Sequence, residues 1–504
     1  MSFDRTLIAA RERQDDEAAL EELARSALAE SAEDAALPLL RQGAENLKSA
    51  RLWQWTGLLE RALDQHERAL ASFGRAAALA PIDQSIAHGR ARVALEAGLP
   101  AEKLFEAALH VSPGKGDVLL GYIASLFAAG KTELAESSLD SVLARSPLWV
   151  DGHIQLAQLR STMGKKDQAT ASIERALQQV PGQEQLWIAL FGVLTQAEQF
   201  VALDEAIARA RRYIANERLL TCHEIVAAIE RADVDRADRI FSSMNSDSRR
   251  SVAVWRIRHL LRTGRLGEAC IAIDEALSGE SALHVWPYAA IAWRLAGDPR
   301  WAWLEGDLER MVSVIDISSD IPDMQGLERV LRGLHVARGE YLDQSVRGGS
   351  QTDGPLFTRV DPEIRALRNA IVRAVGRHVE KLPPVDPRHP LLGERRDRDI
   401  RFSGSWSVLL RGAGYHSNHV HPEGWISSAL YIHLPEHSEH DSKTAGWLTL
   451  GEPQAELGLD LKPFREIEPK KGYLVLFPSY MWHGTRPFEQ GERLTVAFDV
   501  RRPR

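Results

Sequence analysis

Cysteine is almost absent from this sequence. Among 504 residues only Cys222 and Cys270 occur, each inside a segment with helical composition. Two cysteines placed in this way argue against a disulfide framework and against a Cys-x-x-Cys metal site. We therefore expect a protein of a reducing compartment.

Long hydrophobic runs are also missing. No run reaches the roughly 18 apolar residues of a membrane-spanning helix. The first residues, MSFDRTLIAARERQDDEAALEELA, lack the apolar core of a signal peptide. The net charge of −8 gives no excess of positive charge for nucleic acid or an anionic membrane. We expect a soluble cytoplasmic protein without a nucleic-acid or membrane partner, and its length suggests roughly two to four domains.

From about residue 15 to residue 310 the sequence is rich in Ala and Leu with helical spacing, and it repeats. Four prolines follow one another at separations of 32, 34 and 34 residues. A small residue lies twelve residues before each proline, and a bulky apolar residue lies eight residues before each. The three columns are Pro81, Pro113, Pro147, Pro181; Ala69, Ala101, Ala135, Ala169; and Phe73, Phe105, Leu139, Ile173.

This period of about 34 residues resembles the tetratricopeptide repeat (TPR), a helix–turn–helix unit with a small residue where its helices cross. The resemblance implies an N-terminal α-solenoid whose concave groove binds a peptide or protein, or pairs two copies of the chain into a homo-oligomer. A tryptophan-rich segment, Trp286 to Trp303, follows the repeats. We expect it to be a structural cap and not an aromatic ligand site.

The composition changes after about Asp316. A polar stretch, Asp343 to Phe357, precedes an amphipathic helix, Asp361 to Lys381. From Ile400 short β-rich runs follow one another: SWSVLLR, WISSALYIHL, GWLTLG, GYLVLFP and RLTVAFDVR. Many short strands close together favour an antiparallel sandwich or barrel. We predict an α + β multidomain chain: repeats in 1–310, a connecting segment and helix in 311–385, and a β domain in 386–504.

Histidines are concentrated in one stretch of the β domain, YHSNHVHPEGW. If this stretch enters the barrel as a strand, His419 and His421 point to the same face of that strand and can both coordinate one metal ion. His483, in FPSYMWHGTRPF, is the third candidate ligand. Arg493 lies ten residues after His483, and Thr495 shares the strand face of Arg493.

This arrangement resembles the 2-oxoglutarate/Fe(II)-dependent oxygenases, and more narrowly a bacterial subgroup that joins TPRs to such a domain. The segments that carry the resemblance are DQSVRGGSQT, HVHPEGWISSALY and GYLVLFPSYMWHGTRPF. It implies a double-stranded β-helix fold and three cofactors or cosubstrates, Fe(II), 2-oxoglutarate and O2. It also implies that His419, His421 and His483 hold the iron, and that Arg493 with Thr495 binds the far carboxylate of 2-oxoglutarate.

His421 departs from the family pattern, in which HxD or HxE precedes the last histidine. Three neutral imidazoles leave the charge of the ion uncompensated by the protein, although three-histidine iron sites occur in cupin-type dioxygenases. Zinc stays open as well, because three histidines and a water also suit it. Glu423 is an alternative ligand, although Pro422 is expected to end the strand before it.

Other polar residues have two interpretations each. Tyr431 shares the parity of His419 and His421, so it either donates to the cosubstrate or packs in the core. Arg347 lies either over the barrel mouth or in a structural loop, and Arg486 either at the entrance or in a surface ion pair. We expect the remaining ones to lie behind the site, on the surface, in a solvated loop or in structural positions: His416, His433, His437, His440 and Asp499.

The sequence thus predicts a 2-oxoglutarate- and Fe(II)-dependent dioxygenase that hydroxylates a peptide or protein side chain, or a small molecule, with help from the repeats. The alternative is a TPR interaction scaffold whose barrel binds metal but no longer turns over. A third interpretation is a three-histidine cupin-like dioxygenase or zinc enzyme that uses no 2-oxoglutarate. Arg493 favours the first, since a degenerate barrel has no use for a guanidinium aimed at a carboxylate.

Overall fold

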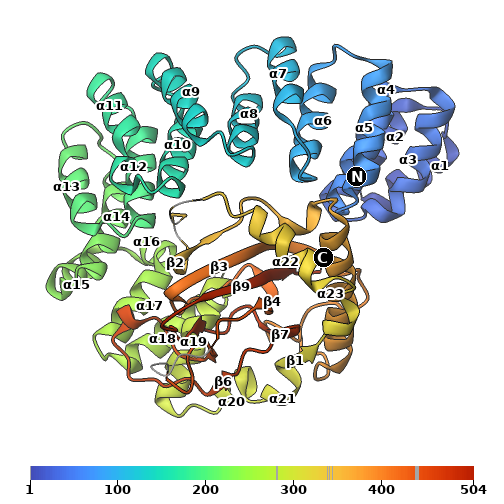
Figure 1. Cartoon of the computed structure of the whole chain (residues 1–504). Helices are drawn as coiled ribbons and strands as arrows, with labels where there is room; N and C mark the ends of the chain where they lie inside the picture. Colours follow the sequence, from blue (N-terminus) through green and yellow to red (C-terminus); the bar gives the residue numbers. More distant parts are fainter. Residues whose placement is uncertain are drawn as a thin grey trace. The chain divides into compact units, whose positions relative to one another are not determined.

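The computed structural model describes residues 2–279, 282–337, 339, 341–342, 344–436 and 442–503. His437 and His440 lie outside these residues. The chain divides into two compact units, shown in Figure 1. The first comprises residues 1–138, 353–369 and 503–504, and the second comprises residues 139–352 and 370–502.

The repeats form consecutive antiparallel helix pairs (Figure 1). The first unit holds α1 (Phe3–Glu12), α2 (Glu17–Glu30), α3 (Glu33–Leu47), α4 (Ala50–Ala62), α5 (His66–Leu79), α6 (Gln84–Glu96), α7 (Glu102–Val111), α8 (Gly116–Ala128) and the start of α9 (Thr132–Arg145). The second continues with α10 (Val150–Thr162), α11 (Ala171–Gln179), α12 (Glu184–Gln196), α13 (Phe200–Ala210), α14 (Glu217–Glu230), α15 (Val234–Ser243), α16 (Ser246–Ser251), α17 (Ala253–Arg262), α18 (Leu266–Leu277) and α19 (Ala282–Ala296).

The sequence columns explain how these pairs pack. The small residues of the repeat are at most 2% exposed: Ala69, Ala101, Ala135 and Ala169. In the first full repeat the Phe73 ring fills the space that two glycines leave open. A Cβ atom at Gly57 would lie 2.7 Å from that ring, and one at Gly89 would lie 2.3 Å from it. The predicted α-solenoid of TPR-like helix pairs is confirmed.

Glu96, at the end of α6, is the centre of an ion-pair network in the first unit. Arg61 donates to its two carboxylate oxygens over 2.6 and 2.7 Å, and Arg92 donates over 3.1 Å. Burial favours the neutral acid, but the hydrogen bonds from His66 and Arg61 outweigh burial and lower the pKa of Glu96 to about 2. The ionised carboxylate therefore stabilises the fold.

We expect Glu96→Gln to destabilise the protein by about 2–3 kcal/mol at pH 7. Because the folded pKa lies below the ordinary value of 4.5, this contribution is fully present above that value and shrinks as the pH falls toward 2. Thermal unfolding at pH 7 and pH 3 measures it. Glu45→Gln, which breaks an exposed ion pair with Arg75, is the control with almost no effect. Equal losses at both pH values would contradict the linkage.

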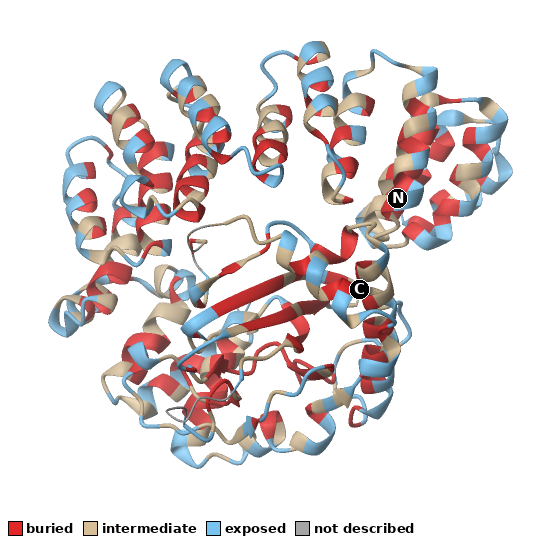
Figure 2. Ribbon diagram, viewed as in Figure 1, coloured by how far each residue is buried: buried red, intermediate tan, exposed pale blue. Residues whose placement is uncertain are grey.

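The C-terminal strands form two antiparallel sheets. The six-stranded sheet has the order β1-β7-β4-β9-β3-β2, and the three-stranded sheet has the order β6-β5-β8. Figure 2 shows that the long central strands are mostly buried. The strands are β1 (Ser313–Asp316), β2 (Val346–Gln351), β3 (Phe402–His416), β4 (Gly424–His433), β5 (Leu448–Leu450), β6 (Arg465–Ile467), β7 (Tyr473–Pro478), β8 (His483–Thr485) and β9 (Glu492–Arg501). The predicted double-stranded β-helix is confirmed.

The residues between the repeats and the β domain contain more structure than their sequence indicates. Strands β1 and β2, the two edges of the larger sheet, both come from residues 311–385. The same segment holds α22 (Met324–Gly333), and α23 (Pro362–Lys381) is the predicted amphipathic helix; two short helices, α20 (Arg300–Glu305) and α21 (Leu308–Met311), precede β1. The three-part division of the chain at residues 310 and 385 stays a prediction.

The tryptophan-rich segment packs inside the second unit. The Trp286 ring lies 6.1 Å from that of Trp293 and 5.9 Å from that of Trp303, measured between centroids. From the β domain, Trp482 donates its indole N–H to the carbonyl of Pro287 over 2.9 Å. These contacts are those of a structural cap on the last repeat, as expected.

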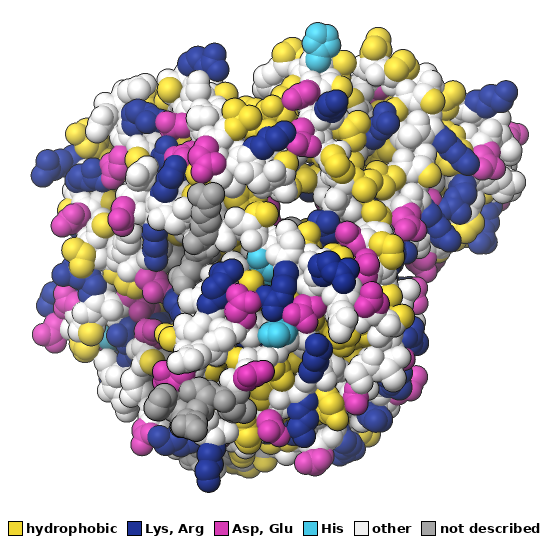
Figure 3. Space-filling view, viewed as in Figure 1, with side chains coloured by type: hydrophobic (Ala, Val, Ile, Leu, Met, Phe, Trp, Pro, Cys, Tyr) yellow, Lys and Arg dark blue, Asp and Glu magenta, His cyan; other side chains and the backbone are white. Residues whose placement is uncertain are grey.

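Charged side chains of both signs are interspersed over the face drawn in Figure 3. Some ion pairs link neighbouring helices: Arg236 pairs with Asp204 and with Glu224. No helix in the described part of the chain combines the length and the hydropathy needed to span a membrane.

Candidate metal centre and cosubstrate pocket

The three predicted histidine ligands come from two segments that pair with each other. His419 and His483 form an isolated antiparallel bridge, in which each N–H donates to the other's carbonyl over 2.9 and 3.0 Å. The N–H of His421 donates to the carbonyl of Ser479 over 2.9 Å. His419 and His421 therefore lie in the connection between β3 and β4, so the expected regular strand is wrong there. Backbone pairing with the β8 segment positions both residues beside His483.

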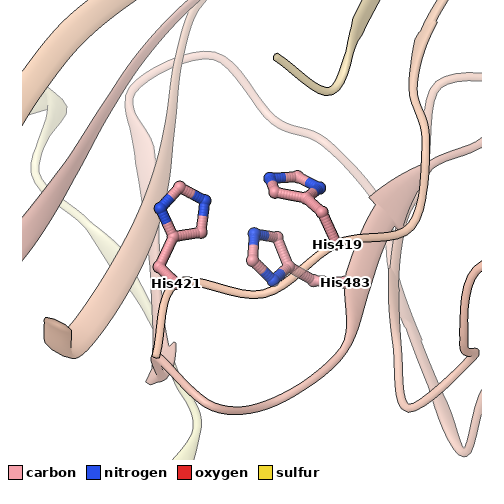
Figure 4. A group of neighbouring side chains, drawn as sticks. All are labelled: His419, His421 and His483. Carbon is pink, nitrogen blue, oxygen red and sulfur yellow. The ribbon is translucent and has the colours of Figure 1, made fainter. Parts of the chain in front are cut away.

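The three side chains converge. One ring nitrogen of each of His419, His421 and His483 lies within 4.8 Å of the other two, and Figure 4 shows the rings grouped together. Each Nδ1 atom lies close to an oxygen that only accepts: Ser417 carbonyl at 2.7 Å, Met481 carbonyl at 3.0 Å and Asp499 carboxylate at 2.8 Å. Nδ1 must therefore carry the proton, which leaves Nε2 with the lone pair that a metal needs.

The environment keeps two of the rings neutral. Burial, followed by the neighbouring His421, lowers the pKa of His419 to about 3. Burial, followed by His419, also lowers the pKa of His483 well below its ordinary value. At His421 burial again disfavours the cation, but the Asp499 carboxylate raises the pKa of the ring. Neutral nitrogens with fixed tautomers fit a divalent metal ion, since a proton does not compete for them at neutral pH.

Arg493 is buried in the same pocket. Its side chain is on β9, 3% exposed, and one Nη donates to the carbonyl of Gly446 over 2.9 Å. Within the described residues its Nε has no hydrogen-bond partner and no carboxylate forms an ion pair with it. Burial accordingly lowers its pKa. Arg493, Thr495 and Asp499 lie on the same face of β9, and all three line the pocket that contains the histidines.

Tyr431 lies against the guanidinium. The Arg493 guanidinium carbon is 5.0 Å from the centre of the tyrosine ring, and Tyr431 is the cross-strand neighbour of Thr495. Tyr431 is fully buried, yet its hydroxyl has no partner among the described residues. The hydroxyl and the neighbouring guanidinium N–H therefore each keep a hydrogen-bonding capacity that acceptor atoms of a polar ligand would satisfy.

Residues 404–499 match the family model described as "Putative 2OG-Fe(II) oxygenase". The matched segment contains six of the candidate site residues, His419, His421, Tyr431, His483, Arg493 and Thr495, whereas Arg347 lies outside it. The resemblance of the C-terminal domain to these oxygenases is thereby confirmed, and the family implies Fe(II) and 2-oxoglutarate. No curated protein matches the chain.

Solved structures show weaker likenesses. A TPR protein from Parabacteroides merdae is 17% identical, covers 43% of this chain and 88% of its own, and has a TM-score of 0.32. A TPR protein of Thermus thermophilus is 23% identical, with coverages of 34% and 96% and a TM-score of 0.27. A Pseudomonas putida prolyl-4-hydroxylase is 17% identical, with coverages of 40% and 99% and a TM-score of 0.26. At these TM-scores none of the likenesses informs the activity of this chain.

Several candidate residues of the β domain lie away from the three nitrogens. The Glu423 carboxylate is 73% exposed and lies 2.9 Å from His284 Nε2, so it points away from the metal group. Arg486 forms ion pairs with Glu452 and Glu466, both at 3.1 Å, as the surface interpretation predicts. His433 pairs with Glu328. His416, in contrast, lines the histidine pocket: its ring stacks 6.0 Å from that of His419, and its Nδ1 lies 3.2 Å from Ser345 Oγ.

Two residues that hold the His421 ring were not predicted from the sequence. Asp499, which we expected to be merely structural, accepts from His421 Nδ1 over 2.8 Å and from Ser427 Oγ over 2.6 Å. Trp406 stacks on the His421 ring: the two ring centroids are 5.6 Å apart, and the ring planes differ by 13°. The parity of Asp499 with Arg493 and Thr495 along β9 is the sequence signal that could have identified it.

A larger cavity adjoins the histidine pocket within the second unit. Its volume is about 590 Å³, and His419 and His421 line both spaces, as do Gln344 and Ser345. Arg347 lines the larger cavity and pairs with Glu198 over 2.9 Å. Arg347 is therefore at the mouth of the site, on β2, and not in an irregular loop. The repeats contribute the turn after α10 and the turn after α12: Ser161, Gly164, Lys166, Gln196 and Glu198.

Proposed function

We propose that this protein is a 2-oxoglutarate- and Fe(II)-dependent dioxygenase that hydroxylates a peptide or protein side chain. The observation that carries the proposal is Arg493, a buried guanidinium without a carboxylate partner in the described part of the chain, in one pocket with three histidines. An unpaired buried charge is unfavourable by several kcal/mol. A dicarboxylate that reaches from the metal to Arg493 removes that penalty.

The pocket residues have two separate roles, metal binding and cosubstrate binding. His419, His421 and His483 would hold Fe(II), and Arg493 would take the far carboxylate of 2-oxoglutarate through its planar fork of donors. Thr495 lies beside Arg493 as a further hydroxyl donor. With iron bound, the family's chemistry converts 2-oxoglutarate and O2 to succinate and CO2, while one C–H bond of the substrate becomes C–OH. Apolar neighbours such as Phe477 and Leu448 keep bulk water from the reacting groups.

The cavity of about 590 Å³ supports a peptide substrate. Its lining is mostly hydroxyl, amide and charged side chains, with Leu342 and Val420 as the aliphatic exceptions. Such a wall suits a ligand with many donors and acceptors, as an extended polypeptide has, better than an apolar small molecule. Because the turns of two repeats form part of the wall, the repeats help to present the substrate to the metal.

Succinate release tests the proposed function. Anaerobically purified protein, loaded with Fe(II) and given 2-oxoglutarate and O2, should release succinate and CO2 in equal amounts even without its substrate. His483→Ala is the control and should release none above background. A parent protein that binds Fe(II) but releases no succinate would favour the competing function, a TPR scaffold with a degenerate metal-binding barrel. The observation in favour of that function is His421, which replaces the carboxylate of the usual family pattern.

A further inference from the structure

Asp499 lies directly behind the His421 ring. Its side chain is 11% exposed. One carboxylate oxygen lies 2.8 Å from His421 Nδ1, and the other accepts from Ser427 Oγ over 2.6 Å. Asp499 is not among the grouped ligand atoms, which belong to His419, His421 and His483. It is therefore one residue removed from the metal position.

The pocket has a deficit of negative charge that Asp499 can correct. Three neutral imidazoles provide none, whereas the usual family pattern has a carboxylate in the place of His421. A carboxylate that accepts the Nδ1 proton of a ligand histidine raises the basicity of its Nε2 and fixes the ring orientation. His421 and Asp499 together thus offer the metal a nitrogen ligand with an anion directly behind it.

We propose that Asp499 is a positioning residue that makes His421 a competent ligand and replaces, one residue further out, the carboxylate that HxD sites bind directly. This inference rests on the proposed metal site. The Asp499 carboxylate can only accept from Nδ1, so it enforces the tautomer with a free Nε2 lone pair. Trp406, stacked on the His421 ring, restricts the rotation that would break this hydrogen bond.

Asp499→Asn tests the role of the charge with almost no change in shape. The amide group can turn its N–H toward Nδ1, which then becomes the acceptor, and the proton moves to Nε2, where it blocks the metal. We expect the affinity for Co(II), a spectroscopic substitute for Fe(II), to fall about 10- to 100-fold. Titration against a chromophoric chelator gives the affinity, and the visible spectrum of bound Co(II) reports the ligand set. Ser427→Ala, which leaves the His421–Asp499 pair intact, should bind within about threefold of the parent.

The His421→Asp background separates the proposed role from a structural one. That variant supplies a carboxylate ligand directly, so adding Asp499→Asn to it should leave the Co(II) affinity unchanged or improve it, because one of two neighbouring like charges is removed. His421→Ala gives the same comparison at higher Co(II) concentrations: there too Asp499→Asn should have no effect. Equal losses with and without the His421 imidazole would show that Asp499 only supports the fold, and would overturn the inference.

The outcomes also distinguish this inference from the proposed function. A parent protein that binds no Co(II) would refute the proposed metal site. A parent that binds Co(II) no better than Asp499→Asn would refute only the role of Asp499 and leave the oxygenase proposal standing.

Discussion

Arg493→Ala is expected to lose most of its affinity for 2-oxoglutarate while keeping its metal. Arg493 is 3% exposed and its Nε has no partner among the described residues, so its contact with a carboxylate takes place away from water. Removing such a buried, charge-assisted contact typically costs about 2–5 kcal/mol, roughly 30- to several-thousand-fold in affinity. Equilibrium dialysis of radiolabelled 2-oxoglutarate against Mn(II)-loaded protein measures the loss.

Three variants control this experiment. Arg493→Lys keeps the charge but lacks the planar fork, so its affinity should lie between those of the parent and Arg493→Ala. Thr495→Ala should show a smaller loss, because only a hydroxyl is removed. Arg486→Ala breaks ion pairs with Glu452 and Glu466 and should bind like the parent. Undiminished binding by Arg493→Ala would remove this residue from the cosubstrate site.

The second large effect concerns the metal ligands. His419→Ala and His483→Ala should each lower Fe(II) affinity on the order of 100-fold or more, a larger loss than changes behind a ligand produce. Their helical circular dichroism should match that of the parent, because the repeat helices pack without the metal. Anaerobic titration with Fe(II) gives the stoichiometry.

His433→Ala is the matched control for these two variants, since it removes a histidine of the same domain whose partner is Glu328. Full iron stoichiometry in His419→Ala or His483→Ala would exclude that residue from the ligand set. A loss of helical signal would instead show that the substitution damages the fold.

The repeats were predictable because their packing leaves a periodic record in the sequence. A small residue must recur where two helices cross, and Ala69 and Ala101 keep that register and are almost fully buried. The central strands were predictable for a similar reason, since β4 and β9 are long and rich in apolar residues. The edges were not: β1 has four residues, and β2, VRGGSQ, contains two glycines and a single apolar residue.

The site was predictable only as far as spacing along one strand reaches. Arg493 and Thr495 are neighbours on one face of β9, and local parity brings them together. The conformation around His419 and His421 depends on backbone pairing with the segment around His483. The two-residue alternation of side chains along a strand does not reveal such a pairing. The contact of His421 with Asp499 is likewise tertiary, so the sequence supplied the residue type and the fold supplied its partner.

The central claim is that one pocket holds the metal and the far carboxylate of 2-oxoglutarate together. Isothermal titration calorimetry of the parent protein with 2-oxoglutarate and with glutarate, each with and without Mn(II), tests it most directly. Glutarate keeps both carboxylates but lacks the keto oxygen that completes chelation of the metal. We predict one 2-oxoglutarate per chain, bound much more tightly with Mn(II) than without it, and a smaller Mn(II) effect for glutarate. Binding that is absent, or that is equally tight without the metal, would contradict the claim.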